Sequence, residues 1–256
     1  MKILVFMSDN RKLDTSMETA EYHSLAASIN SHYCKQHGYD FVYYHPYLYK
    51  KYGPTHKTLK TVSLEQKGIV QDKYLYNCFD PITKEPRHAA WSKLLSTQRA
   101  LQLPYDYVVY IDSDCIFKKD QSIEEFIRPY KKDILFLNDK PTHIDKPCSG
   151  FYILKNTPAT KKFVKDWYHV QMPEKNKEHA WEQSALVSIY KNYDVQLIDE
   201  WMFKEKRGQM LRHICSFDGK DRIPYFKAFM KKHKIPFATD IKIIPFSTKS
   251  KTKKLI

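Results

Sequence analysis

The chain has 256 residues, of which 42% are hydrophobic, and this length is sufficient for one large domain with a buried core. Its formal net charge of +14 indicates a basic surface but does not by itself select a function. The five cysteines are far apart and form no Cys-x-x-Cys pair, which argues against a zinc module or a disulfide framework.

The start of the chain carries no recognisable targeting or anchoring segment. The apolar run from Ile3 to Met7 is far too short for a signal peptide or a membrane anchor. The sequence also has no Asn-x-Ser/Thr sequon, which secreted glycoproteins of this size often carry. We therefore expect a soluble, cytoplasmic protein in a reducing compartment, without a membrane span.

The first part of the chain predicts a β-α-β unit. Residues 3–7 are a short apolar run typical of a buried strand, and they lead into the polar loop 8–10. Residues 21–36 carry apolar side chains four apart and predict a helix, which Gly38 terminates. Residues 41–44 predict the second strand. A strand followed by a polar loop at the start of a chain is typical of α/β nucleotide-binding sheets.

The middle of the chain contains an irregular segment followed by a helix and a strand. Residues 46–86 are rich in Tyr and Lys, contain several prolines and show weak periodicity. We expect an insertion near the active site, the alternative being a segment without function. Residues 89–101 predict a helix that Pro104 ends, and residues 107–111 predict a central buried strand.

The second half of the chain continues the α/β pattern. Two strands and two helices are predicted at residues 134–137, 151–154, 160–169 and 181–190. A late strand is expected at residues 241–244 with Pro245 as its end, followed by a flexible basic tail, 247–256. We find no internal repeat and no linker, so we predict a single domain over residues 1–246.

Two aspartates, Asp112 and Asp114, directly follow the predicted central strand. The Asp-x-Asp spacing alone carries little weight, because such pairs arise often by chance. Their position is more informative, since open α/β sheets bind ligands where strands end. Adjacent carboxylates repel each other unless a cation or hydrogen bonds compensate them, and a divalent ion that bridges to substrate phosphates does so. The alternative is that both aspartates only cap the turn after the strand.

The segment Tyr-Val-Val-Tyr-Ile-Asp-Ser-Asp-Cys-Ile-Phe resembles the DxD segment of GT-A fold glycosyltransferases. The wider pattern is similar to the galactosyl/xylosyltransferase family, which includes fungal α-1,2-galactosyltransferases and plant xyloglucan xylosyltransferases. Matching segments occur in the order of that family at residues 37–40, 87–93, 148–156, 181–186 and 212–216. This chain departs from the pattern where the family usually has Asn, at Cys148 or Ser149, and where Ser216 replaces a Gly.

This resemblance implies an α/β chain with the GT-A (nucleotide-diphospho-sugar transferase) fold, a Rossmann-like mixed central sheet flanked by helices. It implies a metal-dependent glycosyltransferase that moves a sugar from a nucleotide-diphosphate donor, expected to be a UDP-sugar, to a glycan or another hydroxyl acceptor. The chain lacks the N-terminal membrane anchor of Golgi members of the family, and we expect this to be native because Met1 leads directly into the first strand.

The resemblance also implies a metal site. Asp112, Asp114 and His213 are expected to hold Mn²⁺ or Mg²⁺ on the donor diphosphate, and the imidazole ligand favours Mn²⁺. The metal would neutralise the charge that develops on the leaving nucleotide diphosphate. The alternative for His213 is a surface or core histidine without a ligand role.

A larger set of residues is expected from the resemblance to contact the nucleotide-sugar donor. These residues are Ser8, Asp9, Asn10, Tyr22, Arg87, Lys93, Asp112, Ser113, Ser149, Gly150 and Lys220. The loop 8–10 would face the base and ribose, Tyr22 would stack on the base, and the three basic side chains would reach phosphate or sugar. The alternatives are loop capping for 8–10, solvent exposure for Lys220 and a plain strand-opening turn for Ser149 and Gly150.

Glu182 and Gln183 are the candidates for the reaction centre. Enzymes of the family that this chain resembles retain the anomeric configuration of the transferred sugar. A carboxylate or carboxamide beside the donor sugar can stabilise an oxocarbenium-like transition state. If the enzyme inverts instead, one carboxylate must deprotonate the acceptor hydroxyl. The structural alternative is that Glu182 only complements the dipole of a helix N-terminus.

Three rival functions remain open on the sequence. An Asp-x-Asp after an apolar strand also fits the first motif of haloacid-dehalogenase-like phosphatases, although no late acidic pair follows. The second rival is a basic nucleic-acid-binding module. The sequence shows no zinc, Gly-rich or helix-turn-helix signal of such a module, so we expect no nucleic-acid partner. A transferase that has lost activity and serves as a sugar-nucleotide or glycan-binding module is the third.

Overall fold

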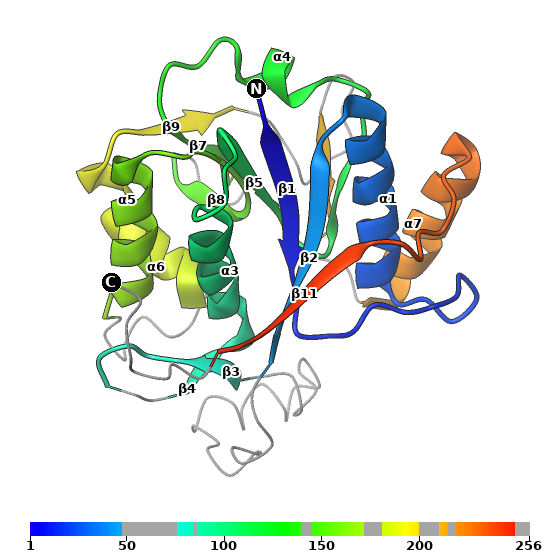
Figure 1. Ribbon diagram of the computed structural model, residues 1–256, viewed down its shortest axis with the longest axis horizontal. Helices are drawn as coiled ribbons and strands as arrows, with labels where there is room; N and C mark the ends of the chain where they lie inside the picture. Colours follow the sequence, from blue (N-terminus) through cyan, green and yellow to red (C-terminus); the bar gives the residue numbers. More distant parts are fainter. Residues whose placement is uncertain are drawn as a thin grey trace.

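The computed structural model describes residues 1–47, 76–83, 86–139, 145–171, 181–199, 210–214 and 219–248. At its centre lies a seven-stranded sheet with the order β11-β2-β1-β5-β8-β7-β9 (Figure 1). These strands are β1 Ile3–Ser8, β2 Asp40–Tyr47, β5 Tyr107–Ile111, β7 Ile134–Asn138, β8 Pro147–Lys155, β9 Val195–Ile198 and β11 Lys242–Ser247. β8 runs antiparallel to both of its neighbours and the other pairs are parallel, so the sheet is mixed, as predicted.

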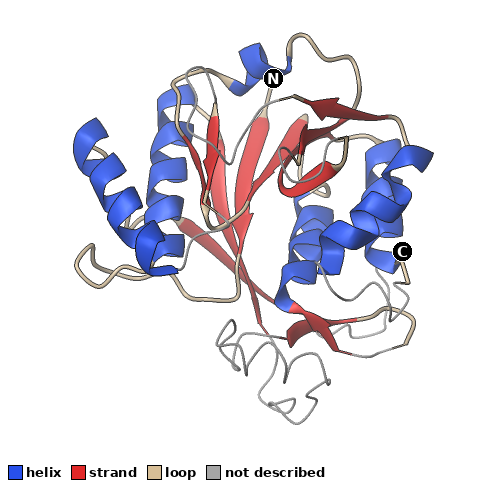
Figure 2. Cartoon of the chain, turned by 180° about the vertical axis from the view of Figure 1, so that it is seen from behind, coloured by secondary structure: helices blue, strands red, loops and turns tan. Residues whose placement is uncertain are grey.

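Helices cover both faces of this sheet. They are α1 Tyr22–His37, α3 Ser92–Ala100, α4 Ile123–Ile127, α5 Pro158–His169, α6 Trp181–Ile189 and α7 Gly219–His233, with the 3₁₀ turns η3 Ala89–Trp91 and η5 Tyr190–Asn192. α1 and α7 lie on one face, and α3, α5 and α6 lie on the other (Figure 2). Among the described residues, no helix has the length and apolar character needed to cross a bilayer.

The alternation of side chains along the central strands explains why these strands are apolar throughout. In β1, Val5 and Met7 pack in the core beneath α1, whereas Leu4 and Phe6 pack in the core beneath α3 and α5, and all four are fully buried. Successive residues of a strand point to opposite faces, so a strand covered on both sides must be hydrophobic at every position.

The predicted end of the first helix is confirmed. Gly38 follows α1 with a φ of 70°, in the left-handed region, and its N–H donates to the carbonyl of Cys34. Glycine adopts this conformation without the penalty that a Cβ atom brings, and it thereby satisfies a carbonyl at the helix end. The chain can then turn back directly into β2.

Several predicted boundaries were wrong. β2 continues to Tyr47 instead of ending at residue 44, and β8 begins at Pro147 instead of residue 151. Residues 89–101 form η3 and then α3, rather than one continuous helix. The last strand does not end at Pro245 but continues to Ser247, with Pro245 opposite His45 of β2. β11 is the outermost strand of the sheet on this side, so a residue without an N–H is tolerated there.

The predicted insertion and tail are described only in part. β2 reaches Tyr47, and two short strands, β3 Tyr76–Phe79 and β4 Pro86–His88, pair antiparallel. In Figure 1 this pair lies at the end of the molecule to which β1 points. Residues 48–75 and 84–85 lie outside the described residues, as do residues 249–256 of the predicted tail. Thr248 is buried, so the described chain is packed up to that position.

Candidate functional site

The Asp112 to Asp114 segment is a tight turn between β5 and the short strand β6, Cys115–Phe117. The Cys115 N–H donates to the Asp112 carbonyl at 3.0 Å, and the Asp112 N–H donates to the Gly150 carbonyl of β8 at 2.9 Å. Both backbone bonds fix the carboxylates at the carboxyl end of β5. The sequence correctly predicts that the aspartates follow a buried central strand.

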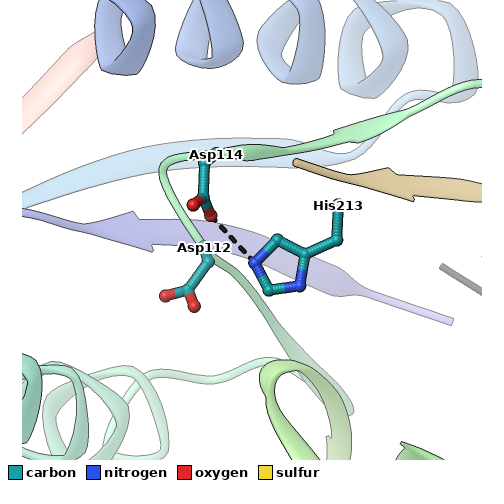
Figure 3. A group of neighbouring side chains, drawn as sticks. All are labelled: Asp112, Asp114 and His213. Atoms are coloured by element: carbon teal, nitrogen blue, oxygen red, sulfur yellow. Dashed lines mark hydrogen bonds and ion pairs between the residues drawn. The ribbon is translucent and has the colours of Figure 1, made fainter. Parts of the chain in front are cut away.

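His213 reaches the same place from a distant part of the chain. It closes β10, Leu211–His213, which pairs antiparallel with β6 and places His213 opposite Cys115. His213 Nε2 lies 2.9 Å from Asp114 Oδ1. Ligand atoms of Asp112, Asp114 and His213 all lie within 4.8 Å of one another (Figure 3). The structure thus brings together the three residues that the sequence predicts as metal ligands.

Gly150 makes this close approach possible. A Cβ atom at position 150 would lie 2.6 Å from His213 Cε1 and 3.2 Å from Asp112 Oδ2. Contacts of 2.6 Å are too short for any side chain, so only glycine lets the imidazole and the carboxylate face each other here. Gly150 lies inside β8, and the alternative of a plain strand-opening turn is therefore wrong.

One oxygen of Asp112 is held by the protein, and the other, Oδ2, lies on the side of Gly150. Lys93 Nζ donates to Asp112 Oδ1 at 3.0 Å, and the Tyr110 hydroxyl donates to the same oxygen. Burial raises the pKa of Asp112 above its ordinary value, against the opposing charge of Lys93. The carboxylate is oriented, because its two oxygens have different neighbours.

Asp114 is surrounded by positive charge. Its Oδ1 lies beside His213, and its Oδ2 lies 3.1 Å from Nη2 of Arg222 on α7. Burial would raise the pKa of Asp114, but His213 and Arg222 lower it well below its ordinary value. Asp114 is therefore ionised at neutral pH, as a cation ligand must be.

A second polar cluster lies beside the first and shares Lys93 with it. Lys93 Nζ lies 2.9 Å from Glu182 Oε1, and the Ser149 hydroxyl donates to the same oxygen at 2.9 Å. Burial would raise the pKa of Glu182, but the ammonium of Lys93 and the bond from Ser149 lower it. Glu182 Oε2 is buried and makes no hydrogen bond within the described part of the chain.

The neighbouring Gln183 is fixed at both ends of its amide. Its Oε1 accepts from the N–H of Ser149 at 3.1 Å and lies 3.0 Å from the Ser149 hydroxyl, whose single proton it shares with Glu182 Oε1. Its Nε2 donates to Asp139 Oδ2 at 2.9 Å. Glu182 and Gln183 lie in the first turn of α6, and both contact Ser149 of β8. Four predicted residues, Lys93 included, therefore converge here.

Three residues that were predicted to contact the nucleotide-sugar donor, Asp9, Tyr22 and Ser113, lie around Arg11. This guanidinium binds both carboxylate oxygens of Asp9, donates to the Ser113 hydroxyl at 3.2 Å and lies 4.5 Å from the centre of the Tyr22 ring. Burial would raise the pKa of Asp9, but Arg11 lowers it. The Ser8 hydroxyl instead lies 2.7 Å from that of Ser96 on α3.

Not all of the residues that were predicted to contact the nucleotide-sugar donor belong to these clusters. Arg87 pairs with Asp80, donates to the carbonyls of Tyr168 and Val170, and lies over the Trp91 ring. These contacts tie β4 to the end of α5 and give Arg87 a packing role. Asn10 follows Asp9 in the loop after β1, and Lys220 is in the first turn of α7, where its side chain is outside the described set.

The sequence profile of the nucleotide-diphospho-sugar transferase family matches residues 54–233, which is more than half of the 256-residue chain. The chain belongs to this family. It is a glycosyltransferase that takes its sugar from a nucleotide donor, and the phosphatase and nucleic-acid-binding alternatives are set aside. A comparison with curated protein sequences finds no match.

Several solved structures are similar to this chain. A glycosyltransferase involved in the glycosylation of the major capsid of PBCV-1 is 12% identical, with a TM-score of 0.58 over 89% of this chain and 100% of that one. A Drosophila β1,4-galactosyltransferase 7 mutant in complex with manganese, UDP-Gal and xylobiose is 11% identical, with a TM-score of 0.44 over 87% and 74%. Mouse xyloside xylosyltransferase 1 is 10% identical, with a TM-score of 0.43 over 84% and 97%. The family match, the mixed sheet and the first of these structures show the predicted GT-A fold.

Four residues of the candidate site were not predicted, among them Tyr110, whose hydroxyl donates to Asp112. Arg11 and Arg222 each carry a guanidinium beside the Asp112 to Asp114 turn, and Asp139 holds the amide of Gln183. Arg11 stands directly after the predicted loop 8–10, which is a signal that the sequence does offer. Nothing local distinguishes Arg222 among 43 basic residues, because its role depends on how α7 packs.

Proposed function

We propose that this glycosyltransferase is metal-dependent, uses a UDP-sugar, and transfers the sugar with retention to a hydroxyl of a glycan, as the resemblance to galactosyl/xylosyltransferases implies. The observation that carries the proposal is the convergence of Asp112, Asp114 and His213 at the carboxyl end of β5, with ligand atoms within 4.8 Å. This is the edge of the sheet at which α/β folds bind nucleotides.

The donor set suits a first-row divalent ion. Two carboxylates and one imidazole, brought within reach by the missing Cβ atom of Gly150, fit Mn²⁺ better than Mg²⁺, which prefers oxygen ligands alone. When bound, the ion would act as a Lewis acid that neutralises charge on the leaving diphosphate. Asp112, Asp114 and His213 would hold it, and Lys93 and Tyr110 would keep Asp112 in orientation.

The nucleotide would lie against the loop after β1. Asp9 and Arg11 form a rigid pair there, and Arg11 links this loop to Ser113 between the two aspartates. Ser8 and Asn10 belong to the same segment. The Tyr22 ring lies beside it, in contact with the Arg11 guanidinium. We propose that this surface receives the base and ribose, while Lys220 at the start of α7 adds positive charge for the diphosphate.

The reacting sugar would lie beside Glu182 and Gln183. The lowered pKa of Glu182 keeps its carboxylate ionised at neutral pH, and such a group is a weak proton acceptor. An ionised carboxylate held by Lys93 is better suited to stabilise positive charge on the sugar in the transition state. This supports retention over inversion with Glu182 as the base.

Thermal unfolding tests the metal and nucleotide together. We expect UDP to raise the melting temperature of the wild type only with Mn²⁺ present, and Asp114→Asn to abolish this effect because it removes a charged ligand. Asp194→Asn makes the same substitution at an exposed position and serves as a control. Stabilisation by UDP that survives in Asp114→Asn and in a chelator would refute the metal site.

Turnover then separates an enzyme from a binding module. A panel of UDP- and GDP-sugars would be screened for donor hydrolysis with Mn²⁺, and the anomeric configuration of the first product formed would be read by NMR. Binding of UDP with Mn²⁺ but no turnover of any donor would favour the inactive binding module. An inverted product would reject retention and point to a carboxylate base.

A further inference from the structure

Arg222 connects α7 to the metal ligand Asp114. Its Nη2 lies 3.1 Å from Asp114 Oδ2, and its Nε donates to the carbonyl of Ile214 at 2.7 Å. The guanidinium also lies over the Tyr22 ring, 4.7 Å from the ring centre. The Nε bond anchors the base of the planar group, while its outer nitrogen faces the carboxylate.

The contact with Arg222 conflicts with ion binding. Asp114 Oδ1 lies 2.9 Å from His213 Nε2, and Oδ2 is in contact with Arg222, so both oxygens of this ligand have protein partners. An ion that takes Asp114 as a ligand would lie close to the Arg222 guanidinium, because both would contact the same carboxylate. His213 is itself a candidate ligand and can join the ion, whereas the positively charged Arg222 would be repelled by it.

The local charges lead to the same conclusion. Lys93 pairs with Asp112 and Arg222 pairs with Asp114, so each carboxylate of the DxD pair already has a protein cation. A divalent ion that bound alone would bring further positive charge into a largely buried site, in which Lys93 and Arg222 already offset two of the three carboxylates. An anion next to Arg222 would offset that charge, and a diphosphate matches the guanidinium fork.

We infer that Arg222 is a diphosphate-binding residue that rests on Asp114 until the ion binds, and then turns its outer nitrogens to the nucleotide diphosphate while Nε stays on Ile214. The inference rests on the proposed function and deepens it. It makes Arg222 a competitor of the ion and a partner of the nucleotide. Ion and nucleotide must then strengthen each other's binding.

Calorimetric titration of Mn²⁺ alone, UDP alone, and UDP at saturating Mn²⁺ tests this in wild type and Arg222→Gln. In the variant we expect Mn²⁺ alone to bind about three-fold or more tightly, because its competitor is gone. UDP at saturating Mn²⁺ should bind about ten-fold more weakly, because a charge-assisted bond is lost. The factor by which Mn²⁺ improves UDP binding should therefore fall.

Two further variants keep the result interpretable. Lys231→Gln removes one positive charge from an exposed position on the same helix and should leave all three affinities unchanged. Arg222→Lys retains the charge but not the fork, so its UDP affinity should lie between those of wild type and Arg222→Gln. If Arg222→Gln folds poorly, Arg222→Lys should still bind UDP more weakly than the wild type.

The outcomes distinguish the inference from the proposal beneath it. Absence of Mn²⁺ and UDP binding in the wild type would defeat the proposed function itself. Wild-type binding with weaker Mn²⁺ affinity in both Arg222 variants would show that Arg222 only supports the site. UDP affinity that Arg222→Gln leaves unchanged would also overturn the inference.

Discussion

Lys93 and Glu182 form an ion pair of 2.9 Å in which both side chains are nearly inaccessible to solvent. The same ammonium lies 3.0 Å from Asp112 Oδ1. Burial would lower the pKa of Lys93, but the charges of Asp112 and Glu182 raise it, so the lysine stays protonated. One buried cation thus links the proposed metal ligand to the proposed reaction centre.

Replacing this cation should destabilise the fold. Lys93→Met leaves the Asp112 and Glu182 carboxylates buried without their shared partner, and we expect the free energy of unfolding to fall by about 3–5 kcal/mol at pH 7. Urea denaturation followed by circular dichroism measures this change. Lys93→Arg retains the charge and should lose much less. Equal stability of Lys93→Met and the wild type would show that the carboxylates are already compensated by other groups.

The fold was predictable where the signals are local. The apolar runs at residues 3–7 and 107–111 and the glycine after the first helix each determine a strand or a helix end within a few residues. The boundaries that failed depend on partners far along the chain. Pro245 continues a strand only because β11 is outermost in the sheet, a fact that lies in the topology.

The site was predictable mainly through the resemblance. Physical reasoning alone placed Asp112 and Asp114 at a strand end, but His213 contacts Asp114 across 99 residues of sequence, and only strand pairing creates that contact. Lys93 was expected on the donor, whereas its nitrogen faces Asp112 and Glu182. A positive residue's partners depend on tertiary packing, and spacing in the sequence does not encode them.

Gly150 provides a test of the metal site that leaves every ligand in place. Gly150→Ala adds a methyl group that would lie 2.6 Å from His213 Cε1, so the imidazole must move away from residue 150 and out of its present position. We expect Mn²⁺ affinity, measured by calorimetry, to fall about ten-fold or more, as displaced or mispositioned ligands commonly cause.

A matched glycine substitution separates this effect from general destabilisation. Gly38 has a φ of 70° and open space around its Cα, so Gly38→Ala should lower stability by about 1 kcal/mol through backbone strain alone. Its Mn²⁺ affinity should equal that of the wild type. If both glycine variants lose Mn²⁺ binding alike, the contact between Gly150 and His213 has no special role.

Acid stability should depend on Asp9. Burial would raise the pKa of Asp9, but Arg11 lowers it below its ordinary value of 3.8. A carboxyl whose pKa is lower in the folded state stabilises the protein above its unfolded pKa, and this stabilisation is lost as the pH falls through the folded value. Asp9→Asn should therefore cost about 1–3 kcal/mol at pH 7 and progressively less below about pH 4.

Urea denaturation of wild type and Asp9→Asn at several pH values between 7 and 3 measures the difference. Asp194→Asn, in which the lost carboxylate is largely exposed, should change stability little at any pH. A difference between wild type and Asp9→Asn that grows on acidification would mean that the carboxyl is protonated in the folded state.

Glu182 can be tested for a role in the chemical step, as distinct from donor binding. Glu182→Gln keeps the shape of the side chain and removes the negative charge that Lys93 and Ser149 hold in place. If that charge stabilises positive charge on the sugar in the transition state, kcat should fall about 100-fold or more, while the donor KM changes by about three-fold at most.

Ser149→Ala supplies the comparison for this prediction. It removes the hydroxyl that contacts Glu182 Oε1 and Gln183 Oε1. The charge of Glu182, its pair with Lys93 and the backbone bond from Ser149 to Gln183 all remain, so kcat should fall by about ten-fold or less. Steady-state kinetics with the best donor of the panel measure both variants. A raised donor KM with normal kcat in Glu182→Gln would make Glu182 a binding residue.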